Sequence, residues 1–263
     1  MAKTAAMTDL AETTALILAG TRPGGDPFAK ECGVAHKGLI EVGGRAILDR
    51  VASVLHDAGV GHVVVSTNCD AIAAMARQRG VDVIASEAGP SASVGAAFRR
   101  YGAPMMVTTS DHALLQADWV RQFAGDSPAG ADLSVMLARR EVVEQAVPGT
   151  QRTWMRFADG HWSGCNMFLL ATPAASRALA LWSEVEANRK KPWRIAARLG
   201  LGTLLGYALG RLTLADVVAR LGERVGIDAR IVAASDGLAA VDVDKASDLA
   251  LVRSLVESRP ELA

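Results

Sequence analysis

The sequence predicts an α/β fold whose central sheet is mainly parallel, with helices on both of its faces. Short apolar and β-branched runs alternate with longer segments in which apolar residues recur at helical spacing. The chain has 263 residues and is 50% hydrophobic, which is enough for a large buried core. Because strands and helices alternate, the chain is expected to form βαβ units, and such units build parallel sheets.

The first half of the chain has the clearest alternation. Thr14–Leu18 is an apolar run that predicts the first strand, and Arg45–Ala58 has helical spacing up to Gly59. Between them, residues 38–42 form a second apolar stretch that we interpret as strand-like. The other strands and helices of this half are expected at His62–Ser66, Asp70–Arg79, Val81–Ala85, Ser91–Tyr101 and Pro104–Thr109.

The second half changes character. Leu133–Arg139 predicts a strand, and Asp159-Gly160 is a common turn between the two strands of a hairpin. The remaining strands are expected at Thr150–Phe157, Trp162–Leu170, Ala229–Ala233 and Ala239–Val243, and the helices at Pro173–Asn188 and Ala246–Glu257. With no internal repeat or clear linker, we expect one domain over residues 1–263. It would have a flexible tail over 1–12 and a basic helical insertion over 183–226.

The composition argues against several classes of protein. The 28 basic and 28 acidic residues give a formal net charge of zero, which argues against a general nucleic-acid binder. The three cysteines are widely spaced, so neither a disulfide framework nor a structural zinc site is expected. The N-terminus lacks the apolar core of a signal peptide, and no run is long enough to span a membrane. We therefore expect a cytoplasmic protein.

A glycine-rich, basic loop follows the first predicted strand, within residues 16–37. It contains Gly20, Gly24, Gly25 and Gly33 together with Arg22, Lys30 and Lys37. Glycine lets backbone N–H groups approach phosphate oxygens closely, and the cations neutralise their charge. The loop is therefore a candidate phosphate-binding loop, although many glycine-rich loops are only turns.

Acidic residues follow two other predicted strands. Asp111 comes shortly after Pro104–Thr109, and Asp242 and Asp244 alternate so that a strand would point both to the same side. Carboxylates at such positions can hold Mg²⁺ against triphosphate oxygens, because magnesium prefers one or two carboxylates together with phosphates. The alternative is that Asp111 and Asp244 each cap the helix that follows.

These candidates are expected to share one edge of the sheet. In open α/β sheets, ligands bind at the carboxyl ends of the parallel strands. The glycine-rich loop, residues 66–70, residues 87–93 and residues 110–112 all follow predicted strands directly. Together they predict magnesium-dependent chemistry on a nucleotide, in which positioning and charge neutralisation do most of the catalytic work.

Four segments resemble a known family. They are LAGTR from Leu18 followed by Lys37 and GLIEVGGRAILDRV, EAGPSASV over 87–94, SDHALL over 110–115 and DVDKASDLALV over 242–252. In this order they resemble nucleotidyltransferases with the molybdenum-cofactor guanylyltransferase-like fold, a group that includes sugar-phosphate and methylerythritol-phosphate cytidylyltransferases. The resemblance implies a Rossmann-like, three-layer α/β/α fold of the nucleotide-diphospho-sugar transferase type, with a mostly parallel mixed sheet.

The resemblance also implies roles for individual residues. Lys37 would contact the α-phosphate under attack, and Arg22 would hold the outer phosphates. Nucleotide-binding roles are implied for Leu18, Ala19, Gly20, Thr21, Gly89, Ser93 and Asp111, with Ser93 helping to read the base. Mg²⁺ would be held by Asp111 and Asp244, with Asp242 as a further candidate. No protein nucleophile is needed, because the acceptor's own phosphate attacks.

The sequence departs from the family pattern at several positions. Thr21 replaces a usual glycine, and an unusually long segment separates Arg22 from Lys37. Lys30 therefore competes with Lys37 for the catalytic role, and we favour Lys37 because it directly precedes the strand-like GLIEV. His112 follows the metal-binding aspartate where a small residue is typical, and we expect it to lie behind the site or in solvent.

Residues for the acceptor are expected in the second half of the chain. Asn166 lies at a position that commonly faces the acceptor in related enzymes, although a structural amide is the alternative. Arg152, Trp154 and Arg156 alternate on a predicted strand, so they would share one face. The two arginines could bind an anionic acceptor through bidentate contacts, or they could belong to an ordinary exposed face.

A basic segment over residues 189–211 carries six Lys and Arg residues and several leucines but no acid. Such a segment can form an amphipathic helix that lies on an anionic membrane or covers a lipid-like acceptor. The alternative is a core-facing helix with solvated cations. Peripheral contact with the inner face of a membrane is thus one expectation for this chain.

The functional expectation is a Mg²⁺-dependent nucleotidyltransferase. It would transfer NMP from an NTP to a phosphorylated small molecule or lipid headgroup and release pyrophosphate, with CTP slightly favoured over GTP. The alternatives are a glycosyltransferase of related fold, which would need an Asp-x-Asp motif, and a non-catalytic nucleotide-binding protein. A Walker-type kinase and a dinucleotide dehydrogenase are disfavoured, because their glycine spacings are absent.

Overall fold

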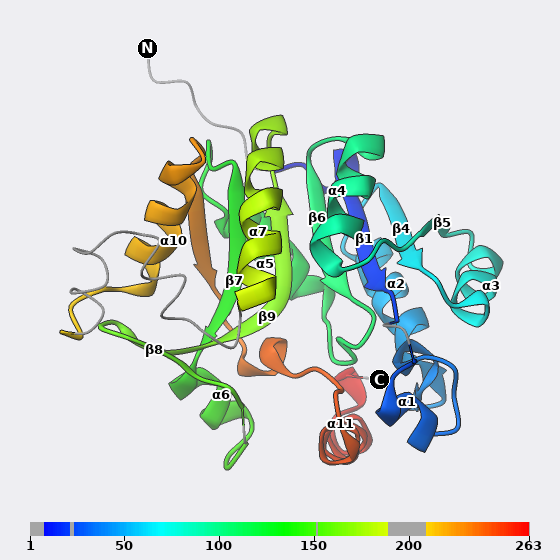
Figure 1. Cartoon of the computed structure of the whole chain (residues 1–263). Coiled ribbons are helices and arrows are strands. Elements are labelled where there is room, and N and C mark those ends of the chain that lie inside the picture. Colours follow the sequence, from blue (N-terminus) through cyan, green and yellow to red (C-terminus); the bar gives the residue numbers. More distant parts are fainter. Residues whose placement is uncertain (1–7, 22–23, 151, 189–208, 263) are drawn as a thin grey trace.

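The computed structural model describes residues 8–21, 24–150, 152–188 and 209–262. Its centre is an eight-stranded sheet with the order β10-β7-β9-β6-β1-β4-β5, to which β8 is added beside β9. Neighbouring strands are parallel except where β9 pairs, because β9 runs antiparallel to β6, β7 and β8. The expected mostly parallel, mixed sheet is confirmed (Figure 1).

The strands of this sheet come from both halves of the chain. They are β1 Thr14–Ala19, β4 His62–Thr67, β5 Asp82–Ala85, β6 Met105–Thr109, β7 Leu133–Arg139, β8 Met155–Phe157, β9 Gly160–Leu170 and β10 Ala229–Ala233. A separate antiparallel hairpin consists of β2 Glu41–Val42 and β3 Arg45–Ala46.

Helices cover both faces of the sheet. The α-helices are α1 Pro27–Glu31, α2 Ile47–Asp57, α3 Asp70–Gln78, α4 Pro90–Tyr101, α5 Ala117–Asp126, α6 Arg140–Ala146, α7 Ser176–Asn188, α10 Leu214–Arg224 and α11 Ala246–Ser258. The 3₁₀ turns are Leu10–Glu12, Lys37–Leu39, Pro173–Ala175, Gly237–Ala240 and Pro260–Leu262. None of the described helices is long and apolar enough to cross a membrane.

Alternation along β1 divides the core into two layers. Leu16 is fully buried against Phe98 of α4, in a cluster onto which Leu179 of α7 also packs. Ile17 points to the opposite face, into the larger cluster that includes Leu55 of α2. Because successive strand side chains face opposite sides, one apolar run supplies both layers of the core. The α/β/α architecture follows, with α4 and α7 on one face (Figure 1).

The carboxyl ends of β1 and β6 are locked side by side. The Ser110 N–H, just past β6, donates to Leu18 O of β1 at 3.0 Å. The same edge of the sheet carries α1 and α11, from opposite ends of the chain (Figure 1). The loop after the first strand, the loop after β6 and the segment before α11 therefore meet at one place.

Two expected strands are absent from the main sheet. In residues 38–42, Lys37–Leu39 is a 3₁₀ turn, because His36 Nδ1 accepts a hydrogen bond from Gly38 N at 2.9 Å, and only β2 is extended. Over 239–243, the chain forms the end of the 3₁₀ turn Gly237–Ala240, which Asp236 caps through Leu238 N at 2.8 Å. The prediction of a strand was therefore wrong over 239–243. Over 38–42 it is correct only for Glu41–Val42, which pairs with β3 outside the main sheet.

Two other predictions are only partly correct. The expected strand Thr150–Phe157 is shortened to Met155–Phe157, and Arg152 ahead of it bonds to Asp242 and does not pair with β9. Within the expected insertion 183–226, α10 is helical and packs on β10, whereas residues 189–208 lie outside the described part of the chain. The expected tail over 1–12 is described only from residue 8, and Leu10–Glu12 is a 3₁₀ turn.

Candidate active site

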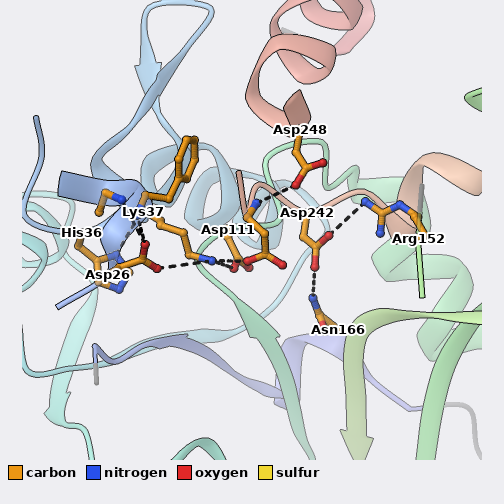
Figure 2. Close-up of polar contacts among 12 residues, drawn as sticks. Asp26, His36, Lys37, Asp111, Arg152, Asn166, Asp242 and Asp248 are labelled. Carbon is orange, nitrogen blue, oxygen red and sulfur yellow. Dashed lines mark hydrogen bonds and ion pairs between the residues drawn. The ribbon is translucent and has the colours of Figure 1, made fainter. Parts of the chain in front are cut away.

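Lys37 lies among three carboxylates that come from distant parts of the chain. Its Nζ lies 2.8 Å from Asp111 Oδ2, 2.5 Å from Asp244 Oδ1 and 3.9 Å from Asp26 Oδ2. Asp111 follows β6, Asp244 precedes α11 and Asp26 begins α1. The fold therefore brings together both acidic segments and the lysine that the sequence singled out (Figure 2).

The charges in this cluster stabilise one another. Burial alone would lower the pKa of the Lys37 ammonium, but Asp111 and Asp244 outweigh burial and raise this pKa above its ordinary value. For Asp111, burial would raise the pKa, but the ammonium of Lys37 lowers it below the ordinary value for an aspartate. Both groups are therefore charged at neutral pH, and Lys37 is a cation held between carboxylates.

A second cluster adjoins the first and is centred on Asp242. Arg152 Nη2 donates to Asp242 Oδ1 at 3.1 Å, and Asn166 Nδ2 donates to Asp242 Oδ2 at 3.1 Å (Figure 2). Burial raises the pKa of Asp242, although Arg152 offsets part of this effect. The two predicted acceptor residues Arg152 and Asn166 thus lie beside the acidic segments, and both are held by the same carboxylate.

Backbone contacts fix the two acidic segments relative to each other. Val243 N donates to Asp111 O at 3.0 Å, so the residue between Asp242 and Asp244 is tied to the loop after β6. Asp242 and Asp244 do not share a strand face as predicted, since one faces Arg152 and the other faces Lys37. The two side chains differ in direction because residues 242–244 do not form a strand, and no neighbouring strand makes their side chains alternate.

Both capping alternatives are excluded by the helix starts. The helix after Asp111, α5, is preceded by Gln116, so Asp111 is too far away to cap it. Lys245 occupies the cap position of α11, and Asp248 Oδ2 inside that helix accepts from Asp244 N at 3.2 Å. The side chains of Asp111 and Asp244 both face Lys37 instead.

A β-bulge aims Asn166 at Asp242. Along β9, Met167 pairs with Met136, but the next pair is Gly164 with Leu137, so two residues of β9 are left without partners. Asn166 is one of them, and its φ of 51° lies in the left-handed region, which Asn tolerates better than most residues. The bulge explains why a strand residue points its amide into the site, which spacing alone did not predict.

The loop after β1 is held by a side-chain amide that the sequence analysis missed. Asn68 Oδ1 accepts from Thr21 N at 2.8 Å, and Asn68 Nδ2 donates to Thr21 O at 2.8 Å. Thr67 Oγ1 donates to Ala19 O at 2.8 Å. A Cβ on Gly20 would lie 3.1 Å from Ser86 Cβ, so glycine permits this close approach. The predicted nucleotide-binding backbone of 18–21 is therefore tightly positioned.

Ser93 shapes the loop before α4. Its Oγ accepts from Glu87 N at 2.9 Å, and Ser93 N donates to Gly89 O at 3.0 Å, where Gly89 caps α4. The hydroxyl is buried and engaged with its own loop. Ser93 thus fixes the shape of the segment proposed to read the base, and a direct contact with the base stays a prediction.

Other predicted residues lie away from this cluster. Arg22 lies outside the described residues, as does most of the basic segment 189–211. Arg156 is exposed on β8, and no contact among the described residues joins it to the site. Lys30 Nζ donates to Gly24 O at 2.6 Å and makes none of the described contacts with the acidic residues, which favours Lys37 as the site lysine.

Two side chains near the site are inert parts of the packing. His112 is buried rather than in solvent, and burial lowers its pKa to about 4, so the ring is neutral at pH 7. Cys165 is a buried core residue, and burial raises the pKa of its thiol to about 12.

Asp26 is the acidic residue of the site that sequence reasoning missed. The available signal was its position before Pro27, a combination that favours a helix start. Its Oδ1 accepts from Phe28 N at 2.8 Å and Ala29 N at 3.1 Å, while Oδ2 faces Lys37. The segment between Arg22 and Lys37 therefore contributes a carboxylate to the site.

The sheet order and the charged site at the carboxyl ends of its strands define an α/β protein with a nucleotidyltransferase-like fold. More narrowly, the chain belongs to the MobA-like NTP transferase domain family, whose model matches residues 15–198. The resemblance inferred from the four segments is thereby confirmed. No curated protein matches the chain.

Solved structures share this fold. A hypothetical transferase from Thermus thermophilus is 29% identical with a TM-score of 0.76, and the match covers 90% of this chain and 99% of that chain. A CMP:2-keto-3-deoxy-manno-octonic acid synthetase complexed with CTP is 16% identical with a TM-score of 0.57, covering 94% and 98%. A 4-diphosphocytidyl-2C-methyl-D-erythritol synthase from Anaerococcus prevotii is 9% identical with a TM-score of 0.54, covering 93% and 98%.

Proposed function

We propose that the protein transfers a nucleoside monophosphate from an NTP to a phosphorylated acceptor and releases pyrophosphate. The observation that carries the proposal is the Lys37 ammonium 2.8 Å from Asp111 Oδ2 and 2.5 Å from Asp244 Oδ1, at the edge where β1 and β6 end. A lysine beside carboxylates at this edge suits phosphoryl chemistry, in which catalysis rests on positioning and charge neutralisation.

The reaction needs few groups from the protein. An oxygen of the acceptor's phosphate forms a bond to the α-phosphorus, and the bond from that phosphorus to the bridging oxygen of the β-phosphate breaks. Pyrophosphate leaves with the electron pair, so no protein nucleophile takes part. Lys37 would neutralise the charge that builds on the α-phosphate, and the backbone of 18–21, which Asn68 holds, would orient the nucleotide.

The residues present fit a magnesium ion. Asp111 Oδ1 is buried and has no hydrogen-bond partner among the described residues. Asp111 Oδ2 and Asp244 Oδ1 both contact the Lys37 ammonium, so the two carboxylates face one point. The described residues contain no cluster of three or more metal-ligating side chains, and magnesium needs only one or two carboxylates when phosphates supply the rest. We propose that Asp111 and Asp244 hold Mg²⁺, which would polarise the phosphate oxygens.

The proposed donor is CTP in preference to GTP. The segment EAGPSASV over 87–94 resembles the cytidylyltransferase version of the base-reading segment. Two of the solved structures with this fold have names that contain CMP or a cytidyl group. The proposed acceptor carries a phosphate, because the Arg152 guanidinium beside the acidic segments could bind one once its Nη2 is released from Asp242.

Pyrophosphate release tests the proposal directly. The protein is incubated with Mg²⁺, each of the four NTPs and a panel of phosphorylated sugars, polyols and lipid headgroups, and pyrophosphate is measured with a coupled enzyme assay. We expect release that requires both an NTP and one acceptor class. Binding of an NTP without pyrophosphate release from any acceptor in the panel would favour the non-catalytic alternative.

Variants connect that activity to the site. Lys37→Ala or Asp111→Ala should lower the rate of pyrophosphate release by about 10²–10³-fold, the usual loss when one group that stabilises transition-state charge is removed. Lys30→Ala is the matched control, because Lys30 contacts a backbone carbonyl and should leave the rate unchanged. Turnover like that of the wild type in both site variants would contradict the assignment.

A further inference from the structure

The Lys37 ammonium occupies the space between the two carboxylates proposed to hold magnesium. Its Nζ is within hydrogen-bond distance of Asp111 Oδ2, at 2.8 Å, and of Asp244 Oδ1, at 2.5 Å (Figure 2). Magnesium binds carboxylate oxygens at about 2.0–2.1 Å, so an ion coordinated by both oxygens would have to displace Nζ. An ammonium and a metal ion that both contact these two oxygens would repel each other strongly, so Nζ and the ion are not expected to bind there at the same time.

A displaced ammonium has a further carboxylate within reach. Asp26 Oδ2 lies 3.9 Å from Nζ on the side of α1, and the side chain of Asp26 is 29% exposed. Its other oxygen, Oδ1, caps α1 through Phe28 N and Ala29 N. The cap holds Asp26 in place, which leaves Oδ2 available to a cation without the cost of ordering the side chain.

We infer that Lys37 and a divalent cation compete for Asp111 and Asp244, and that Asp26 is a positioning residue that receives the ammonium when the cation binds. The inference rests on the proposed function for the identity of the two metal-holding carboxylates. Lys37 then has two partners, the carboxylate pair in the metal-free protein and Asp26 in the metal-loaded protein. A nucleotide's phosphates attract the same ammonium, so the nucleotide favours metal binding.

The inference assigns a task to the long segment between residues 22 and 37. A shorter connection would reach Lys37 without Asp26, and the ammonium would then have only Asp111 and Asp244 as carboxylate partners among those described. The segment thus supplies a third carboxylate that can compensate Lys37 while metal occupies the other two. The segment between residues 22 and 37 thus has a role in the site through the carboxylate of Asp26.

Metal binding without nucleotide tests the competition. Mn²⁺ serves as the probe, and its dissociation constant is measured by electron paramagnetic resonance for wild type and for Lys37→Met. We expect at least about tenfold tighter binding in Lys37→Met, because a unit positive charge is removed a few ångströms from the ion. Lys37→Arg keeps the charge and Lys30→Met removes a lysine outside the cluster, so both should bind Mn²⁺ like wild type.

The folding of the neutral variants is checked by circular dichroism and thermal unfolding. Lys37→Gln provides a second neutral variant whose amide can still donate to the carboxylates, should Lys37→Met fail to fold. Each neutral variant should be less stable than wild type in chelator and should regain stability in Mg²⁺, because the ion replaces the lost ammonium. Folded neutral variants that bind Mn²⁺ no more tightly than wild type would overturn the competition.

A double-mutant cycle tests Asp26. Asp26→Asn retains a good helix cap, since Asn caps as well as Asp. Loss of the Asp26 carboxylate should weaken Mn²⁺ binding more in the wild-type chain than in Lys37→Met, because only the wild type has an ammonium that must move to Asp26. Equal weakening in both backgrounds would refute the positioning role and leave a general charge effect.

The Mn²⁺-binding and stability measurements are made without nucleotide and without acceptor. A wild-type protein that releases no pyrophosphate would refute the proposed function and would leave the Mn²⁺ result intact. Conversely, an active enzyme whose Lys37→Met variant binds Mn²⁺ like wild type would keep the function and lose this inference. The two proposals can therefore fail separately.

Discussion

At the scale of single residues, the site consists of two charge clusters that meet at residues 242–244. Lys37 compensates Asp111 and Asp244 in one cluster, and Arg152 compensates Asp242 in the other. The side chains of Arg152 and Asp242 are only 12% and 24% exposed, so solvent screens this pair weakly. Removing one partner should therefore cost more than it would for a surface ion pair.

Arg152→Met should lower the free energy of unfolding by about 1–3 kcal/mol, the usual cost of leaving a buried polar group without its partner. Burial already raises the pKa of Asp242, and loss of Arg152 would raise it further. A carboxyl group with a raised pKa in the folded state favours folding below that pKa. The deficit should therefore be small near pH 4 and larger at pH 7.

Urea denaturation of the variant at both pH values measures this dependence. Adding Asp242→Asn to Arg152→Met removes the uncompensated charge and should recover part of the loss at pH 7. The loss of stability could be the same at both pH values, or the double variant could show no recovery. Either result would mean that the uncompensated carboxylate of Asp242 does not cause the destabilisation of Arg152→Met.

At the scale of elements, the segment before α11 is positioned by close packing on α6. A Cβ on Gly237 would lie 2.3 Å from Val142 O and 2.4 Å from Val143 Cα, so the 3₁₀ turn Gly237–Ala240 fits only with glycine there. This turn leads directly to Asp242 and Asp244. The placement of the two carboxylates thus depends on a backbone contact outside the site.

Gly237→Ala should destabilise the protein by about 1–3 kcal/mol, the range for overpacking a well-packed region. It should also lower activity, because the turn must shift away from α6 and carry the acidic segment with it. Gly164→Ala is the control, since a Cβ at Gly164 meets nothing within 4 Å. Unfolding by urea and pyrophosphate release are measured for both, and equal behaviour of the two variants would contradict the packing argument.

At the scale of the whole molecule, the site is assembled from both ends of the chain. Lys37 precedes the hairpin β2–β3, whereas Asp244 lies just before the closing helix α11. Arg50 of α2 joins the first half of the chain to two later segments. Its Nε donates to Ala113 O, in the loop after β6, at 3.2 Å, and its Nη2 donates to Leu262 O in the C-terminal 3₁₀ turn. A ligand that binds this site should therefore stabilise the fold globally.

Magnesium and the preferred NTP together should raise the thermal midpoint by about 5–10 °C. A ligand at 100 times its dissociation constant adds about 2.7 kcal/mol, and for a chain of this size each kcal/mol is worth about 2–4 °C. Differential scanning fluorimetry with each NTP, with and without chelator, measures the shift. The shift should vanish in chelator and in Asp111→Ala, and a shift that survives both would place the nucleotide elsewhere.

The sequence by itself determined the architecture and the identity of most site residues. Alternation of apolar runs and helical periods is a local property, so most strands and helices were predicted to within one or two residues. Because parallel strands end at one edge, the positions of Asp111 and the glycine-rich loop after their strands were sufficient to place them together. Lys37 was chosen because it precedes GLIEV, and Asn166 because of its position in related enzymes. Both lie beside the acidic segments, and their roles stay predictions. Arg152 also lies there, although it precedes β8 and is not on the strand from whose alternation it was chosen.

Only the tertiary structure decided which basic side chain pairs with which carboxylate in the site. Pairing between Lys37 and Asp244 joins residues at opposite ends of the chain, and no local period encodes such a contact. The strand expected over 239–243 was lost because the apolar run packs against α6 and the core without a ladder partner. Asn166 reached Asp242 through a bulge, and Asp26 reached Lys37 through a helix cap. Long-range packing fixed these contacts, which is why local sequence patterns did not predict them.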